Sequence, residues 1–120
     1  MSDRLAQQNL DTQDLDTQDL DTQNLDKLRA QYLDLINHQL PAAAKSRKMP
    51  VRFNHCFARI VLDNLCQGCW YNAFSRKQPA YRQLSEAQLQ AAIVIARSML
   101  QSPKTAIALN QNSLRWRGKL

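Results

Sequence analysis

The segment Met49–Tyr71, MPVRFNHCFARIVLDNLCQGCWY, constrains the fold of this chain more than any other. It holds all three cysteines, one of the two histidines and one of the two tryptophans. Its apolar residues recur at three- and four-residue steps, which is the spacing of one helix face. We therefore expect a central helix over His55–Gln67, with Asn54 as N-cap and Gly68 at the C′ position. Its predicted core face comprises Phe53, Phe57, Ile60, Val61, Asn64 and Leu65.

An earlier helix is predicted over Leu25–Leu40, where apolar residues again recur at three- and four-residue steps. Asn24 is its expected N-cap. Pro41 is expected to end it, because a proline disfavours helical backbone in the residue before it. The basic link over residues 42–50 is expected to be a short helical extension or a loop.

The clearest helix start in the chain is Ser85-Glu86-Ala87-Gln88, which has the pattern of a capping box. The buried stripe of the helix that follows is predicted to be Leu89, Ala92, Ile93, Ala96, Met99 and Leu100. Ser102-Pro103 should stop this helix and start another over Pro103–Gln111, since serine caps helices and proline suits the first helical position. No pair of alternating runs predicts a sheet. The fold class is therefore expected to be all-α, a small bundle of three to four helices.

The N-terminal segment repeats with a period of five, with leucines at 10, 15, 20 and 25. This period forms no stripe on a helix and alternates between the faces of a strand. We predict a flexible, low-complexity acidic arm over residues 1–24 and a basic helical domain over 25–120. A faint similarity to pentapeptide-repeat proteins is the alternative, although four repeats would make only about one coil and repeats need neighbours to be stable.

Charge is unevenly distributed along the chain. Residues 1–26 carry seven aspartates against Arg4 alone, whereas residues 27–120 carry 15 Lys and Arg against three carboxylates, for a net charge of +6 overall. A domain this basic is expected to attract an anionic partner, with nucleic acid first and an acidic protein second. The acidic arm could shield that surface, and solubility alone is the simpler explanation of the charge.

A membrane partner and an exported location are not expected. The N-terminus is polar, without the apolar stretch of a signal peptide. The longest apolar run, Ala91–Ala96, is too short to cross a bilayer. An odd number of cysteines argues against a closed disulfide framework, so the expected location is the reducing cytoplasm.

Basic residues interleaved with aromatics are the best candidates for binding. Arg115-Trp116-Arg117 places an indole between two guanidinium groups, which suits a base stacked on the ring and phosphates held by the arginines. The predicted nucleic-acid-binding residues are Arg115, Trp116, Arg117, Lys119, Lys45, Arg47, Lys48 and Arg52. A further basic cluster with an aromatic comprises Arg76, Lys77, Tyr81 and Arg82. The alternative is that Leu114 and Trp116 pack on the bundle while the arginines stay in water.

The Cys66-Gln67-Gly68-Cys69 motif has three interpretations. A zinc site would need four ligands, and the nearby supply is His55, Cys56, Cys66 and Cys69. A redox pair would need a thiol of low pKa at a helix N-terminus, whereas this motif follows a predicted helix. The preferred interpretation is two small apolar side chains packed at a helix end, so no cofactor is expected and zinc is the alternative.

Residues 25–120 also resemble a family of short bacterial proteins of uncharacterised function. The residues that carry the resemblance are Met49–Phe57, Leu62-Asp63-Asn64, Pro79-Ala80-Tyr81, Leu109–Leu114 and Arg117-Gly118-Lys119. Some members carry the label of a GNAT-type acetyltransferase. The resemblance implies acyl transfer as an alternative function. The glycine-rich loop of GNAT enzymes has no counterpart, however, because Gly68 and Gly118 stand alone. No site residue is therefore carried over.

The sequence gives little support for an enzyme, because the body has no paired carboxylates, no phosphate loop and one isolated candidate base, His55. The predicted function is a small, non-enzymatic helical protein whose basic surface binds an anionic partner.

Overall fold

A computed structural model describes residues 23–120, and this part of the chain is helical without a strand. The all-α prediction is confirmed for it. The first helix covers residues 23–44 and contains a π-helical turn, η1, at Leu35–Gln39 before its last segment, α2, at Leu40–Ala44. The later elements are α3 (Asn54–Cys66), the 3₁₀ turn η2 (Trp70–Asn72), α4 (Ala80–Gln83), α5 (Glu86–Gln101) and α6 (Pro103–Trp116).

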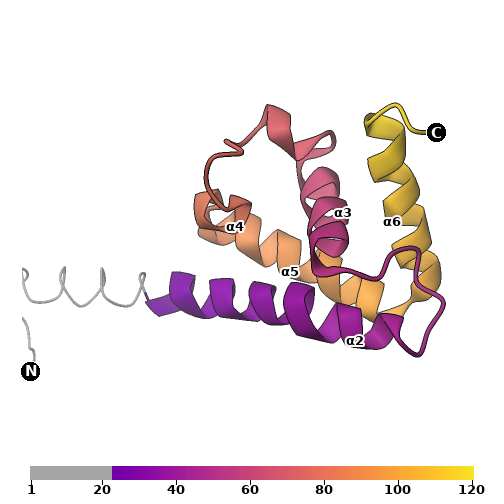
Figure 1. Cartoon of the computed structure of the whole chain (residues 1–120). Coiled ribbons are helices and arrows are strands. Elements are labelled where there is room, and N and C mark those ends of the chain that lie inside the picture. The colour runs from indigo at the N-terminus through magenta and orange to yellow at the C-terminus, as the bar shows by residue number, and fades with distance from the viewer. Residues whose placement is uncertain (1–22) are drawn as a thin grey trace, which may run out of the picture.

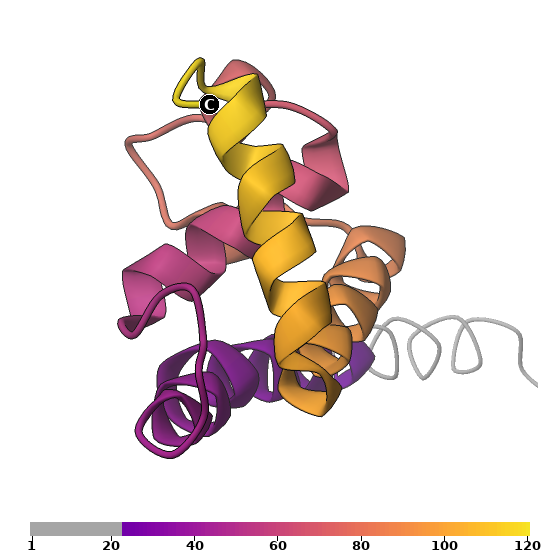
Figure 2. The same cartoon turned by 90° about the vertical axis from the view of Figure 1, so that its right-hand side faces the viewer.

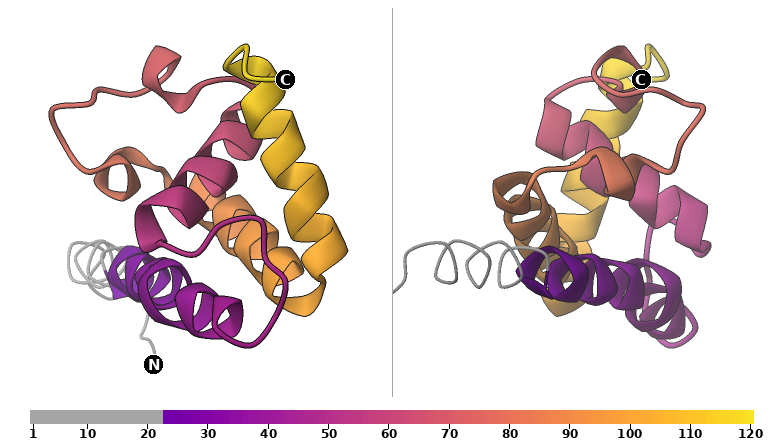
Figure 3. Two further views of the ribbon diagram at one scale, coloured as in Figure 1. Left: turned by 45° about the vertical axis from the view of Figure 1, so that its right-hand side comes forward. Right: turned by 90° about the vertical axis from the view of Figure 1, so that its left-hand side faces the viewer.

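The helix α3 occupies the centre of the bundle. It packs against α5, α6, the first helix and η2 (Figure 1). The first helix runs across one end of α3, and α6 lies beside α3 with the C-terminus at the opposite end (Figure 2). Between η2 and α4 the chain leaves the other helices and arches back towards the first helix (Figure 3). No helix within residues 23–120 is both long and apolar enough to span a bilayer.

The core is built from one face of each long helix. Sixteen apolar residues of the described part of the chain are buried: Tyr32, Leu35, Ile36, Leu40, Phe57, Ile60, Val61, Leu62, Ala80, Leu84, Leu89, Ala92, Ile93, Ala96, Met99 and Ala106. Their removal from water is the main force that holds the helices together. Two polar residues, Asp63 and Ser113, are buried with them.

Two helices begin where the sequence predicts, at the capping residues Ser85 and Ser102. The hydroxyl of Ser85 accepts a hydrogen bond from the N–H of Gln88 at 3.1 Å, and Gln88 Oε1 accepts from the N–H of Ser85 at 2.9 Å, completing the capping box. Ser102 caps α6 through the N–H of Thr105 at 3.3 Å. Five members of the predicted α5 stripe are buried, and the sixth, Leu100, is half-buried.

The first helix does not end at Pro41 but continues to Ala44, so the first part of the link is the short helical extension that the sequence left open. Proline lacks an N–H group, and its ring clashes with the carbonyl four residues earlier in an α-helix. The π turn η1 immediately precedes this proline, and the N–H of Leu40 bonds the carbonyl of Leu35 across it. A widened turn accommodates the ring, so the helix continues to Ala44. The predicted N-cap, Asn24, lies inside the helix, and the predicted arm lies outside the described residues except for positions 23 and 24, which are helical.

Both predicted ends of α3 are wrong by one residue. Phe53 occupies the N-cap position, and Asn54 begins the helix and donates a hydrogen bond to Asn37 of the first helix at 3.1 Å. At the other end, Gln67 rather than Gly68 adopts the left-handed conformation, with φ 53° and ψ 45°. Phe53 was also expected in the core, but its side chain is 64% exposed.

Candidate functional site

A cleft of about 670 Å³ opens between the first helix, α3 and the arch that leads to α4. This volume lies within the range of small-ligand sites. Its lining is Tyr32, Leu33, Ile36, Asn37, Asn54, His55, Cys56, Ala58, Arg59, Leu62, Trp70, Tyr71, Arg76, Lys77, Gln78, Pro79, Ala80 and Tyr81. Three of these side chains are cationic, four are large aromatics, and none is a carboxylate. The cleft therefore has a positive, aromatic wall suited to a planar anion.

The aromatic wall at the arch is held by stacked cations. The guanidinium carbons of Arg76 and Arg117 lie 4.1 and 4.9 Å from the centroid of the Tyr71 ring. The ring of Trp70 meets that of Tyr71 edge-on, with centroids 4.6 Å apart. Stacking of a guanidinium on a ring leaves its N–H groups directed outward, where they can bind oxygen atoms. Arg76 is thus oriented before any ligand arrives.

The buried carboxylate of Asp63 anchors this end of the cleft. Its Oδ1 accepts a hydrogen bond from the backbone N–H of Trp70 at 3.0 Å. Arg117 donates Nε to Oδ2 at 2.6 Å and Nη2 to Oδ1 at 3.1 Å, and the hydroxyl of Ser113 donates to Oδ2 at 2.6 Å. Hydrogen bonding to Asp63 raises the pKa of the Arg117 guanidinium, so the pair stays ionised. This network joins α3, η2 and α6.

Arg59 connects the same network to the interior of the cleft. Its guanidinium donates to Ser113 Oγ at 2.7 Å and to Asn110 Oδ1 at 2.8 Å, both on α6. Within residues 23–120 no carboxylate forms an ion pair with Arg59, Arg76 or Lys77. Because no acidic side chain of this region neutralises them, these cations give the cleft a net positive field.

The predicted C-terminal binding segment is divided between two roles. Arg117 is turned inward to Asp63, and only 16% of its side chain is exposed. Arg115 and Lys119 are exposed, and 39% of Trp116 is exposed. The predicted arrangement, an indole flanked by two solvent-facing arginines, is therefore not formed, because one of the two arginines neutralises a buried carboxylate.

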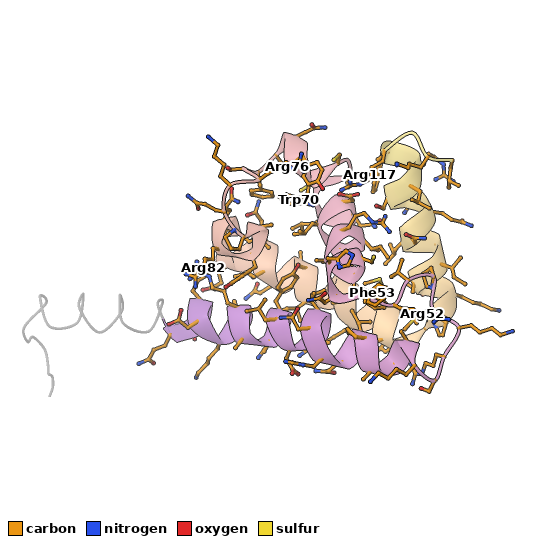
Figure 4. All side chains as sticks on the ribbon, viewed as in Figure 1. Arg52, Phe53, Trp70, Arg76, Arg82 and Arg117 are labelled. Carbon is orange, nitrogen blue, oxygen red and sulfur yellow. The ribbon has the colours of Figure 1, made fainter. Side chains whose placement is uncertain are left out.

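The second predicted cluster lies away from the first. Lys45, Arg47, Lys48 and Arg52 are exposed in the connection from α2 to α3. Arg47 donates a hydrogen bond to the carbonyl of Leu100 and so ties this connection to α5. In Figure 4, Arg52 lies near the start of α3 and Arg117 near its end. The two clusters do not form one continuous surface.

The four candidate zinc ligands do not converge. Cys56 and Cys66 stand ten residues apart on α3, which separates them by about 15 Å along the helix axis. No group of three or more His, Cys, Asp or Glu side chains within the described residues is placed to hold a metal ion. His55 and Cys56 line the cleft, whereas Cys66 is the last residue of α3 and Cys69 follows it.

The Cys66 side chain does not have the character of a reactive thiol. Burial, with smaller contributions from Asp63 and Cys69, raises the pKa of the Cys66 thiol. A raised pKa lowers the thiolate fraction, and the thiolate is the nucleophile and the metal ligand.

Sequence reasoning missed most of the cleft. The predicted cluster that best matches the cleft is Arg76, Lys77, Tyr81 and Arg82. Three of its members, Arg76, Lys77 and Tyr81, line the cleft. Asp63, one of the three carboxylates of residues 27–120, was given no role. The available signal was its position directly after Ile60-Val61-Leu62, because a carboxylate within an apolar helix face must find buried partners.

Comparisons with protein-family models, curated proteins and solved structures find no match for this chain. The resemblance to the short bacterial family, and the acetyltransferase label with it, stays a prediction.

Proposed function

We propose that this protein binds single-stranded nucleic acid in the cleft between the first helix, α3 and the arch. The observation that carries this proposal is the lining of the cleft, in which the described residues combine Arg59, Arg76 and Lys77 with the exposed ring of Tyr71 and the partly buried rings of Trp70 and Tyr81, without a carboxylate. Single-strand binding sites combine a positive groove for the phosphates with aromatic side chains on which bases stack.

The form of the cleft favours an unpaired strand over a duplex. The residues Tyr71 and Trp70 belong to the lining of a cleft. Bases in a duplex are already stacked on their neighbours, so only unpaired bases can place their faces on such rings. Arg76, held over the Tyr71 ring, would bind a phosphate of the strand next to a base placed against the aromatic wall of the cleft.

The test is fluorescence anisotropy with a labelled oligothymidylate of about ten nucleotides, titrated at several salt concentrations. Affinity should fall as salt rises, because phosphate binding releases counterions. The substitutions Arg76→Ala and Lys77→Ala should each weaken binding and reduce the salt slope by about one. Arg97→Ala is the matched control, since Arg97 is exposed on α5 and does not line the cleft.

Three results would contradict the proposal. One is a lack of binding, and another is affinity independent of salt. The third is equal weakening by Arg97→Ala and Arg76→Ala, which would assign binding to net charge alone. Binding of polyglutamate without binding of the oligonucleotide would replace nucleic acid by an acidic protein surface as the partner. Arg115→Ala tests the C-terminal segment directly, and a loss there without a loss at Arg76 would move the site away from the cleft.

A further inference from the structure

Phe53 was predicted to lie in the core, but the structure places its side chain in solvent. It precedes α3 with extended backbone, φ −106° and ψ 152°, and 64% of its side chain is exposed. Its ring lies parallel to that of His55, with an interplanar angle of 3° and centroids 5.9 Å apart. One exposed ring is ordinary for a protein surface, but this ring is stacked with His55, which lines the cleft, so its outer face is open to a base.

The surroundings of this pair continue the chemistry of the cleft. His55 and its neighbour Asn54 line the cleft, and the exposed Arg52 precedes Phe53 in the chain. This group therefore combines a cation, Arg52, with the stacked rings of Phe53 and His55. Arg76 and Tyr71 form a similar combination at the arch.

The two groups stand at opposite ends of α3. Phe53 and Arg52 lie near its first residue, and Trp70 and Arg76 lie towards its other end, where the N–H of Trp70 bonds Asp63 (Figure 4). The helix has 13 residues. At the rise of an α-helix its length is about 20 Å. The cleft follows α3 from Asn54 to Leu62 and continues to Trp70 and Tyr71, so a ligand that touches both groups must be extended.

We infer that Phe53 and His55 form a second base-stacking platform, and that a strand of about four nucleotides runs along α3 from this platform to Tyr71. The inference rests on the proposed function and adds to it the path and the length of the bound strand. An acidic peptide with an apolar side chain over Phe53 would also be extended, and the test below separates it from a nucleic acid.

The test is a series of oligothymidylates of increasing length, measured at constant salt with the full chain. Affinity of the unaltered protein should rise steeply until both platforms are occupied, at about four nucleotides, and more slowly beyond. Phe53→Ala should lower the affinity for longer oligonucleotides roughly tenfold and leave the affinity for a dinucleotide nearly unchanged, because the dinucleotide fits at the Tyr71 end. Phe53→Trp should retain the length dependence.

Val94→Ala is the matched control. Val94 lies on α5, does not line the cleft, and is 66% exposed, close to the exposure of Phe53. Neither substitution should change the thermal midpoint appreciably, since neither removes a core contact. Equal losses at every length, or no loss with Phe53→Ala, would overturn the second platform while leaving the proposed function intact. A lack of binding by the unaltered protein would overturn both, and binding of an acidic peptide in place of the oligonucleotides would assign the platform to a protein partner.

Discussion

Asp63 and Arg117 close the bundle at the end of α3 through two hydrogen bonds, from Nε to Oδ2 at 2.6 Å and from Nη2 to Oδ1 at 3.1 Å. The carboxylate is fully buried, and the guanidinium is 16% exposed. Because Arg117 also lies over the ring of Tyr71, the same pair positions one wall of the cleft. Stability and the candidate site are thus linked through one arginine.

Arg117→Ala should destabilise the protein by about 3–5 kcal/mol, the usual effect of leaving one partner of a buried ion pair alone. Arg117→Lys should cause a smaller loss, because an ammonium group cannot form the two parallel hydrogen bonds of a guanidinium. Urea unfolding followed by circular dichroism gives the free energies of unfolding.

Arg115→Ala is the control, since Arg115 is exposed and should change stability by no more than about 0.5 kcal/mol. A loss for Arg117→Ala no larger than that for Arg115→Ala would show that Asp63 is satisfied by Ser113 and Trp70 alone.

Local signals in the sequence predicted the helices. The features that the sequence did not predict depend on tertiary contacts. The capping box at Ser85 and the cap at Ser102 are complete within a few residues, so their residue types alone predict them. The helix α6 instead runs five residues beyond its predicted end at Gln111. Asn110 and Ser113 hydrogen-bond Arg59 of α3, and contacts of this kind hold the added turns in place.

The candidate site depends even more on contacts distant in sequence. The partners Asp63 and Arg117 are 54 residues apart, and no spacing rule connects them. The prediction that Arg117 faces solvent treated the C-terminal segment alone, whereas the buried carboxylate on α3 determines where this side chain points. The prediction for Phe53 failed because it applied helical periodicity to the residue before α3. The backbone of Phe53 is extended, so this residue does not share a helix face with α3.

Gln67 provides a test of the left-handed end of α3. A side chain with φ 53° is strained by contact of its Cβ with the backbone, and glycine has no Cβ. Gln67→Gly should therefore stabilise the protein by about 0.5–1 kcal/mol, after allowing for the greater unfolded-state freedom of glycine. Gly68→Ala is the companion change, because a Cβ at that position would meet no atom within 4 Å and the backbone there is not left-handed. It should be neutral or stabilising by up to about 1 kcal/mol. Destabilisation by Gln67→Gly with stabilisation by Gly68→Ala would contradict the conformation described for this turn.

The buried phenol of Tyr32 predicts how stability depends on alkaline pH. Its side chain is 2% exposed, and burial raises the pKa of the phenol well above its usual value near 10. Above about pH 10 the unfolded chain therefore loses this proton while the folded chain retains it, so the folded state binds more protons and stability falls as pH rises. The fall attributable to this group should approach about 1.4 kcal/mol per pH unit and should be absent below about pH 9.

Urea unfolding at pH 8 and pH 11, for the unaltered protein and for Tyr32→Phe, isolates this contribution, since phenylalanine keeps the ring and removes the proton. Equal losses of stability in the two proteins between these pH values would show that the phenol of Tyr32 ionises freely in the folded state.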